Sequence, residues 1–110
     1  MIVEDDAMIS MLIEQYSELL GFEEAVCVEN VQAALDAISR GGIDTAIVDI
    51  HLAGGETSEP VAEALVASRI PFVVSTGGFV SDPTPVWKDR PIVEKPFTLA
   101  SLTEAFERLK

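Results

Sequence analysis

The sequence predicts an α/β fold with a parallel sheet of five strands and helices on both faces of the sheet. Five short runs rich in Val and Ile alternate with segments whose apolar residues recur at helical spacing. The runs are almost continuously apolar, as is typical of strands that are covered on both faces. Alternating β and α units of this length favour right-handed crossovers between parallel strands.

Five strands are predicted from these runs, with their carboxyl ends at one edge of the sheet. The runs are Ile2–Val3, Ala25–Val28, Thr45–Val48, Phe72–Ser75 and Ile92–Val93. For five strands connected in this way, the flavodoxin-like order 2-1-3-4-5 is the expected arrangement. Its switch point, where open α/β sheets bind ligands, then lies between the first and third strands.

Helices are predicted from apolar stripes and from the residues that begin or end them. The first stripe consists of Ile9, Leu12, Ile13, Tyr16 and Leu20, and the second of Val31, Ala34, Leu35 and Ile38. The first helix is expected to stop at Gly21, and the second to run from its cap at Asn30 to Gly41-Gly42. A third helix is predicted over residues 58–69.

The last two helical segments differ in how clearly the sequence predicts them. The final helix is expected to begin at Thr98 and to bury Leu99, Leu102, Phe106 and Leu109. Between the fourth and fifth strands, Gly77-Gly78 and several prolines leave little room for a regular helix. A short or irregular fourth helix is therefore expected between them.

Composition restricts the class of protein. The 110 residues are predicted to form one domain, residues 1–110, and a hydrophobic share of 48% with a mean hydropathy of +0.31 argues against disorder. No apolar stretch approaches the roughly 18 residues of a membrane helix, and the N-terminus lacks the features of a signal peptide. The single cysteine, Cys27, is expected to be a buried strand thiol. Together these features predict a cytoplasmic protein that does not bind membranes.

The chain is strongly acidic, with 19 Asp and Glu against 7 Lys and Arg and a net charge of −12. Contacts to nucleic-acid phosphates and anionic membranes require clustered Lys and Arg, so this balance disfavours both kinds of partner. Much of the acidity is expected on solvated helix surfaces.

Charged residues follow three of the predicted strands. Glu4-Asp5-Asp6 follows the first strand, Asp49 the third, and Lys95-Pro96 the fifth. Because parallel strands present these ends at one edge, carboxylates from two strands and an ammonium from another are predicted to converge. Carboxylate oxygens select Mg²⁺ or Mn²⁺, and Mg²⁺ typically accepts phosphate oxygens of a substrate as well. The arrangement suits a divalent cation and a phosphoryl group.

Each of these residues also has a purely structural interpretation. Glu4-Asp5-Asp6 could be an acidic first turn that favours the helix dipole, with Asp6 mainly a helix cap. Asp49 could bond to nearby backbone amides at the start of a loop. However, a carboxylate that ends a buried strand is costly unless it is paired, metal-bound or used chemically. Lys95 taken alone would most often be a solvated lysine.

A chemical role would use Asp49 as the nucleophile, since a metal-neutralised carboxylate can attack phosphorus and form an aspartyl phosphate. Lys95 could then neutralise a phosphoryl oxygen, and Thr76, at the end of the fourth strand, could donate its hydroxyl. The alternative for Thr76 is a local turn bond before Gly77-Gly78. His51 has no Ser, Cys or second His at a motif spacing and is expected to be a surface loop histidine.

Four short motifs coincide with this predicted site: VEDDAMI at the start, IVDIHLAGGE around Asp49, STGG at Thr76 and VEKPF at Lys95. In this order the chain resembles, over essentially its whole length, the receiver domain of two-component response regulators. The resemblance implies that Asp49 accepts a phosphoryl group, that Thr76 is the switch hydroxyl and that Lys95 contacts the phosphoryl group. It also implies a Mg²⁺ (or Mn²⁺) site whose ligands are Glu4, Asp5, Asp49 and the backbone carbonyl of His51.

The resemblance further implies a signalling domain and not an enzyme. The phosphoryl group would come from a histidine kinase or a histidine phosphotransfer protein, and the output would be contact with a downstream protein partner. A monomer or weak dimer is expected.

A narrower resemblance is to the FATGUY receivers, through IPFVVSTGGFV and RPIVEKPF. Val74-Ser75 stands where that pattern has Phe-Ala. Ile92 stands where many receivers carry a switch aromatic, so no Tyr or Phe rotamer change is expected to report phosphorylation. The expected switch is an ordering of the Gly77–Asp89 segment when Thr76 moves toward the phosphoryl group.

Three alternatives stay open from the residues alone. The first is a pseudo-receiver that binds a partner without phosphorylation. The second is a small phosphohydrolase, which is disfavoured because His51, and not an acid, stands two positions after Asp49. The third is a flavodoxin-like cofactor carrier, which is disfavoured because acids follow the first strand where a bound phosphate would need donors.

Overall fold

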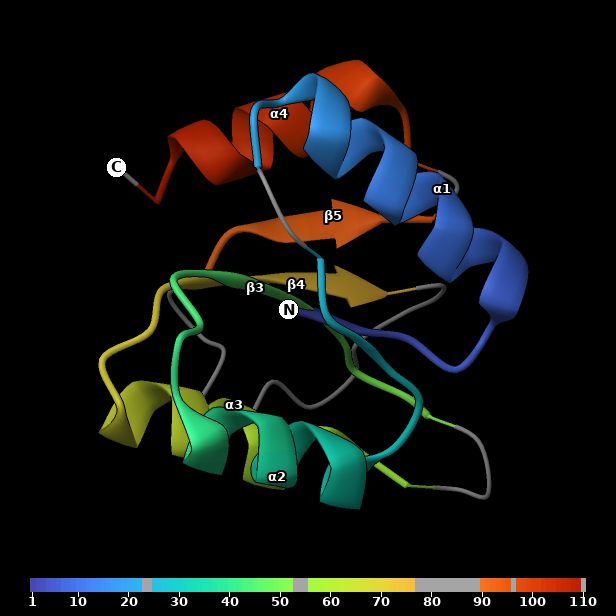
Figure 1. Cartoon of the computed structure of the whole chain (residues 1–110). Helices are drawn as coiled ribbons and strands as arrows, with labels where there is room; N and C mark the ends of the chain where they lie inside the picture. Colours follow the sequence, from blue (N-terminus) through green and yellow to red (C-terminus); the bar gives the residue numbers. More distant parts are fainter. Residues whose placement is uncertain (23–24, 53–55, 77–89, 96, 110) are drawn as a thin grey trace.

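The computed structural model describes residues 1–22, 25–52, 56–76, 90–95 and 97–109 (Figure 1). Its elements in chain order are β1 (Ile2–Val3), α1 (Ala7–Leu19), β2 (Cys27–Val28), α2 (Val31–Arg40), β3 (Ala46–Asp49), α3 (Glu59–Ala67), β4 (Phe72–Thr76), β5 (Ile92–Glu94) and α4 (Leu99–Glu107). Strands β3, β4 and β5 each continue one residue beyond the predicted end, so that Asp49 and Thr76 are the last residues of strands. Two predicted starts are too early, because β2 begins at Cys27 and β3 at Ala46. The helix expected between β4 and β5 falls in segment 77–89, which lies outside the described residues.

The sheet has the order β2-β1-β3-β4-β5, and all of its strand pairs are parallel. This confirms the predicted order and class. The register places Val3 opposite Val48 and Asp49 opposite Ser75. The residue after β1, Glu4, therefore arrives beside Asp49 at the carboxyl edge of the two central strands.

Two hydrophobic cores cover the two faces of the sheet, because successive strand residues point to opposite sides. Helices α2 and α3 lie on one face, and α1 and α4 lie on the other (Figure 1). The α2–α3 core takes Val3, Val48 and Val74 from the strands. The α1–α4 core takes the preceding residue of each of those strands, namely Ile2, Ile47 and Val73. The central strands are therefore packed on both faces up to the edge where they end.

Three of the described helices, α1, α2 and α4, begin at side-chain caps that the sequence predicts, whereas α3 has no side-chain cap bond. Asp6 accepts hydrogen bonds from the backbone N–H groups of Met8 and Ile9 at the start of α1, and Asn30 accepts one from Ala33 at the start of α2. Thr98 and Ser101 form a reciprocal capping box at the start of α4. Because Asp6 is used in this way, the acids left for the site after β1 are Glu4 and Asp5.

Two burial predictions are wrong at the edges of the cores. Cys27 is exposed, with its Sγ 3.7 Å from Glu14 Oε2. It belongs to β2, which is the edge strand of the sheet that the described residues form. Leu12 of α1 is also exposed. The buried residues of α1 are Ile13 and, one turn later, Ser17, whose hydroxyl donates to the Ile13 carbonyl.

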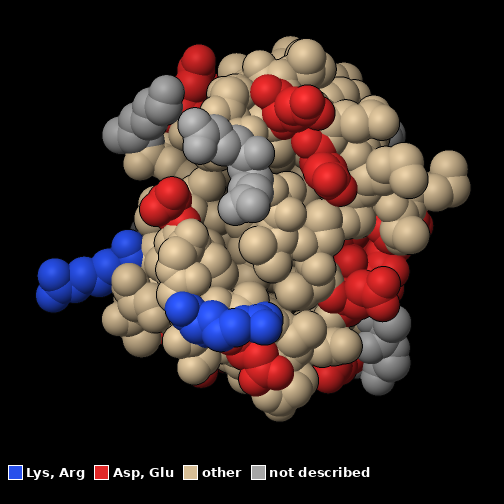
Figure 2. Space-filling view, viewed as in Figure 1, with Lys and Arg blue, Asp and Glu red and all other residues tan. Residues whose placement is uncertain are grey.

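Acidic side chains are spread over the face shown in Figure 2, whereas the basic side chains visible there lie toward one side. Of the helix glutamates expected in solvent, Glu59 is half-buried in the first turn of α3. The others are exposed, namely Glu14, Glu18, Glu63, Glu104 and Glu107. In the part of the chain that the structure describes, no helix is both long and apolar enough to span a bilayer.

Candidate functional site

The predicted site residues meet at the carboxyl edge of the sheet. Asp49 ends β3 and Thr76 ends β4, while Glu4 and Lys95 directly follow β1 and β5. Glu4, Asp49 and Thr76 are 2%, 5% and 3% exposed, whereas Asp5 is exposed. The site is therefore a group of buried polar side chains with one carboxylate at its surface.

Lys95 connects the carboxylates of two strands. Its Nζ lies 2.5 Å from Glu4 Oε1 and 3.0 Å from Asp49 Oδ2. The backbone N–H of Lys95 donates to the Thr76 carbonyl at 2.8 Å, which fixes the start of the side chain beside the end of β4. From there the side chain reaches β3 and β1, and its ammonium is the cation of both ion pairs.

Burial gives Glu4 unusual acid–base behaviour. Removal from water raises the pKa of Glu4 to about 7, against the hydrogen bonds from Lys95 and from the Asp6 amide, which lower it. The nearby charge of Asp49 also raises this pKa. For Lys95, burial alone would lower the pKa, but the hydrogen bonds to Glu4 and Asp49 outweigh it and raise the pKa above its ordinary value. The ammonium is therefore charged at neutral pH.

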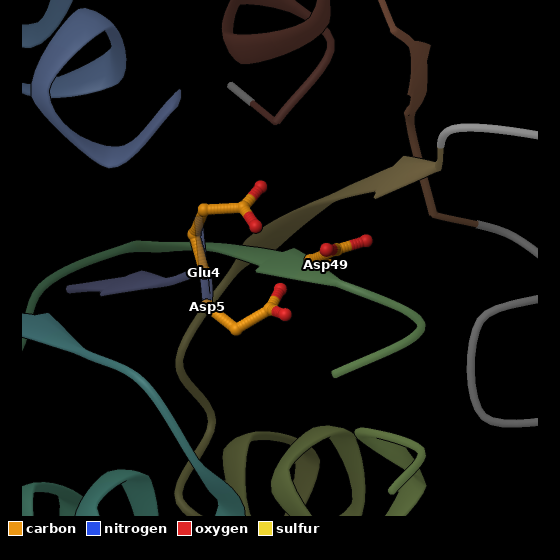
Figure 3. A group of neighbouring side chains, drawn as sticks. All are labelled: Glu4, Asp5 and Asp49. Carbon is orange, nitrogen blue, oxygen red and sulfur yellow. The ribbon is translucent and has the colours of Figure 1, made fainter. Parts of the chain in front are cut away.

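Three carboxylates could hold a metal ion here. Glu4, Asp5 and Asp49 each offer one oxygen, and these oxygens lie within 4.8 Å of one another. Figure 3 shows Glu4 and Asp5 projecting from the chain after β1, next to Asp49 at the end of β3. In an octahedral Mg²⁺ site adjacent oxygens are about 3 Å apart and opposite oxygens about 4.2 Å, so these three carboxylates lie near the spacing that the ion requires. The donor set fits a hard divalent cation.

Comparison with solved structures places the chain among known proteins. SdrG from Sphingomonas melonis Fr1 is 44% identical, and the match covers 98% of this chain and 92% of SdrG with a TM-score of 0.87. The BeF3-activated conformation of SdrG matches over the same shares with a TM-score of 0.83. A response regulator receiver domain (CheY-like) from Methylobacillus flagellatus is 27% identical over 99% of this chain and 95% of its own, with a TM-score of 0.82.

The chain belongs to the response-regulator receiver family. No protein-family model matches it, and no curated protein does. Receiver domains are signalling domains and not classical enzymes, which agrees with the resemblance in the sequence.

The receiver's remaining predicted site residue is His51. Its side chain is exposed, as expected of a surface loop histidine. His51 forms an isolated antiparallel bridge with Thr57, whose two hydrogen bonds run from Leu52 N to the Glu56 carbonyl and from Ser58 N to the Ile50 carbonyl. The His51 carbonyl takes part in neither bond. Its predicted use as a metal ligand stays a prediction that this geometry permits.

Sequence reasoning missed one contact of the receiver site, the direct ion pair between Lys95 and Glu4. It assigned Lys95 to a phosphoryl group and Glu4 to a metal, and it did not pair them with each other. Their strands, β1 and β5, are not neighbours in the sheet, so no register argument brings the two side chains together. The signal that could have found the contact is charge alone, because three acids and one lysine share the edge.

Proposed function

We propose that this receiver domain takes a phosphoryl group onto Asp49 from a phosphohistidine of a partner protein, in a reaction that depends on Mg²⁺. The observation that carries the proposal is the position of Asp49. Its buried carboxylate ends a central strand, contacts the Lys95 ammonium and lies beside the carboxylates of Glu4 and Asp5. A carboxylate in such surroundings is a suitable nucleophile toward phosphorus.

The transfer step forms one bond and breaks one. A carboxylate oxygen of Asp49 attacks the phosphorus while the bond from phosphorus to the histidine nitrogen breaks. The electron pair of that bond stays with the imidazole, which takes up a proton from solvent to become neutral. The product is an aspartyl phosphate, so the phosphoryl group has moved from one protein to the other.

The chain's own residues position and neutralise the transferred group. Lys95 provides a point charge for one phosphoryl oxygen, and the Thr76 hydroxyl donates to another from the end of β4. When Mg²⁺ is bound by Glu4, Asp5, Asp49 and the His51 carbonyl, further positive charge is available for the phosphoryl oxygens. Transfer then rests on positioning and charge neutralisation.

The finer features of the proposal concern partners and subfamily. A histidine kinase or histidine phosphotransfer protein is the donor, and a downstream protein in the cytoplasm receives the output. BeF3 is a mimic of a phosphoryl group on a carboxylate, and the BeF3-activated conformation of the 44% identical SdrG supports an acceptor role for the equivalent site here. The proposal of a FATGUY-type receiver rests on the sequence around Thr76 and Lys95.

Intact mass after incubation with acetyl phosphate and Mg²⁺ tests the function. We expect a gain of one phosphoryl group that is lost in Asp49→Asn and in the presence of EDTA. Asp44→Asn is the matched control, because Asp44 is exposed and precedes the opposite end of β3. This variant should be labelled like the unaltered protein.

The other outcomes separate the alternatives. Labelling that survives Asp49→Asn would place the acceptor elsewhere and contradict the proposal. If neither acetyl phosphate nor a phosphorylated histidine phosphotransfer protein labels the domain, while a known receiver is labelled alongside, the chain is a pseudo-receiver.

A further inference from the structure

A buried serine hydroxyl lies at the start of α3 and contacts the chain that follows β3. Ser58 is 0% exposed, and its Oγ donates to the Ile50 carbonyl at 3.3 Å. The backbone N–H of Ser58 donates to the same carbonyl at 2.9 Å. Ser58 directly precedes α3, yet its side chain makes no cap bond to that helix. The hydroxyl therefore holds the turn after β3 and does not serve as a helix cap.

The backbone of β3 bonds alternately to its two neighbours in the sheet. The Ile47 N–H donates to the Met1 carbonyl on the β1 side, whereas the Ile50 N–H donates to the Ser75 carbonyl on the β4 side. In an extended strand the N–H and C=O of one residue point to the same side, and those of the next residue point to the opposite side. The backbone groups of Ile50 therefore face the β4 side.

The direction of the His51 carbonyl follows from this alternation. His51 is one residue beyond Ile50, so its carbonyl faces the β1 side. Glu4 and Asp5 follow β1 and lie on that side (Figure 3). Because a peptide unit is planar, fixing the Ile50 carbonyl also fixes the His51 N–H. Ser58 thus restricts the rotation that would turn the His51 carbonyl away.

We propose that Ser58 is a positioning residue of the receiver, whose N–H and hydroxyl fix the Ile50–His51 peptide and so keep the His51 carbonyl directed toward Glu4 and Asp5. This inference deepens the proposed function and rests on it, since that function uses the His51 carbonyl as a cation ligand. Without the hydroxyl, a single bond from the Ser58 N–H holds the peptide. The turn then has more freedom, and ordering it on binding lowers affinity.

Calorimetric titration with Mg²⁺ tests this role of the hydroxyl. The affinity of Ser58→Ala should be about fivefold weaker than that of the unaltered protein, which corresponds to about 1 kcal/mol. Ser17→Ala is the matched control, because Ser17 is also buried and its hydroxyl donates to the Ile13 carbonyl within α1. It should leave the Mg²⁺ affinity unchanged. Equal affinities of Ser58→Ala and Ser17→Ala would overturn the inference.

A second measurement needs no substitution. The carbonyl ¹³C signal of His51, followed by NMR, should shift as Mg²⁺ is added and should saturate with the calorimetric dissociation constant. The carbonyl signal of Ile50, which Ser58 holds, should shift less. Binding of Mg²⁺ without a shift of the His51 carbonyl would overturn the inference and leave phosphoryl transfer to Asp49 intact. If the unaltered protein binds no Mg²⁺ at all, the metal-dependent step of the proposed function fails together with the inference.

Discussion

Replacement of Lys95 by Met should destabilise the metal-free protein more than replacement of an exposed cation. The ammonium neutralises two carboxylates that are only 2% and 5% exposed, Glu4 and Asp49. Breaking a buried ion pair by removing one partner typically costs about 3–5 kcal/mol. Here the cost is reduced, because the Lys95 side chain is 17% exposed and Glu4 can take up a proton. We therefore expect a loss of about 2–3 kcal/mol, which for a domain of this size lowers Tm by roughly 10–20 °C.

Thermal unfolding followed by circular dichroism at pH 7.5 in EDTA measures this loss. Arg108→Met serves as the control, since its ion pair with Glu104 joins two exposed residues four positions apart and is worth less than about 0.5 kcal/mol. Saturating Mg²⁺ should return most of the stability to Lys95→Met, because bound cation replaces the missing charge. Equal Tm values for the two variants in EDTA would refute the reasoning, since the ammonium would then not be what neutralises the cluster.

Two further predictions address Thr76 and Glu4. Thr76→Ala should slow labelling by acetyl phosphate by roughly 10²-fold, because removing one donor to a developing charge typically costs that much. Thr76→Ser keeps the hydroxyl and should keep most of the rate. Equal labelling rates for the two variants would contradict a role of the hydroxyl. Because the pKa of Glu4 is raised to about 7 in the folded metal-free protein, the folded state holds a proton that the unfolded chain has released. This group's stabilising contribution is full below its unfolded pKa and is lost as pH rises through about 7, so urea unfolding in EDTA should show stability falling over that range. Glu4→Gln should remove this part of the pH dependence, and an unchanged slope would show that another group causes it.

The fold was predictable because each central strand can be recognised from its own apolar residues. Val and Ile at successive positions of β1, β3 and β4 supply both cores, so a continuous apolar run already indicates a strand covered on two faces. Caps at Asp6, Asn30 and Thr98 are local signals, which is why the starts of three helices agree with the structure. Cys27 shows the limit of such evidence. The burial of its side chain depends on whether β2 is a central or an edge strand, and an apolar run in the sequence does not distinguish the two.

The location of the site was also predictable, because it follows from topology. Parallel strands end on one side, and the order 2-1-3-4-5 places the ends of β1 and β3 together at the centre. Any acids after those two strands must then meet. The roles assigned to Asp49, Thr76 and Lys95 stay predictions until labelling tests them, but their convergence required only the order of the strands.

The pairing of charges within the site was not predictable, because it depends on relative burial. Three carboxylates lie near the Lys95 ammonium. It forms ion pairs with Glu4 and Asp49, while Asp5 is exposed to solvent. A carboxylate that has lost its water gains most from a cation, whereas a solvated one gains little. Glu4 and Asp5 are adjacent in the sequence and carry the same charge, so only the direction in which the chain leaves β1 distinguishes them. That direction also leaves the Asp5 carboxylate in solvent, while Glu4 and Asp49 are buried against the Lys95 ammonium.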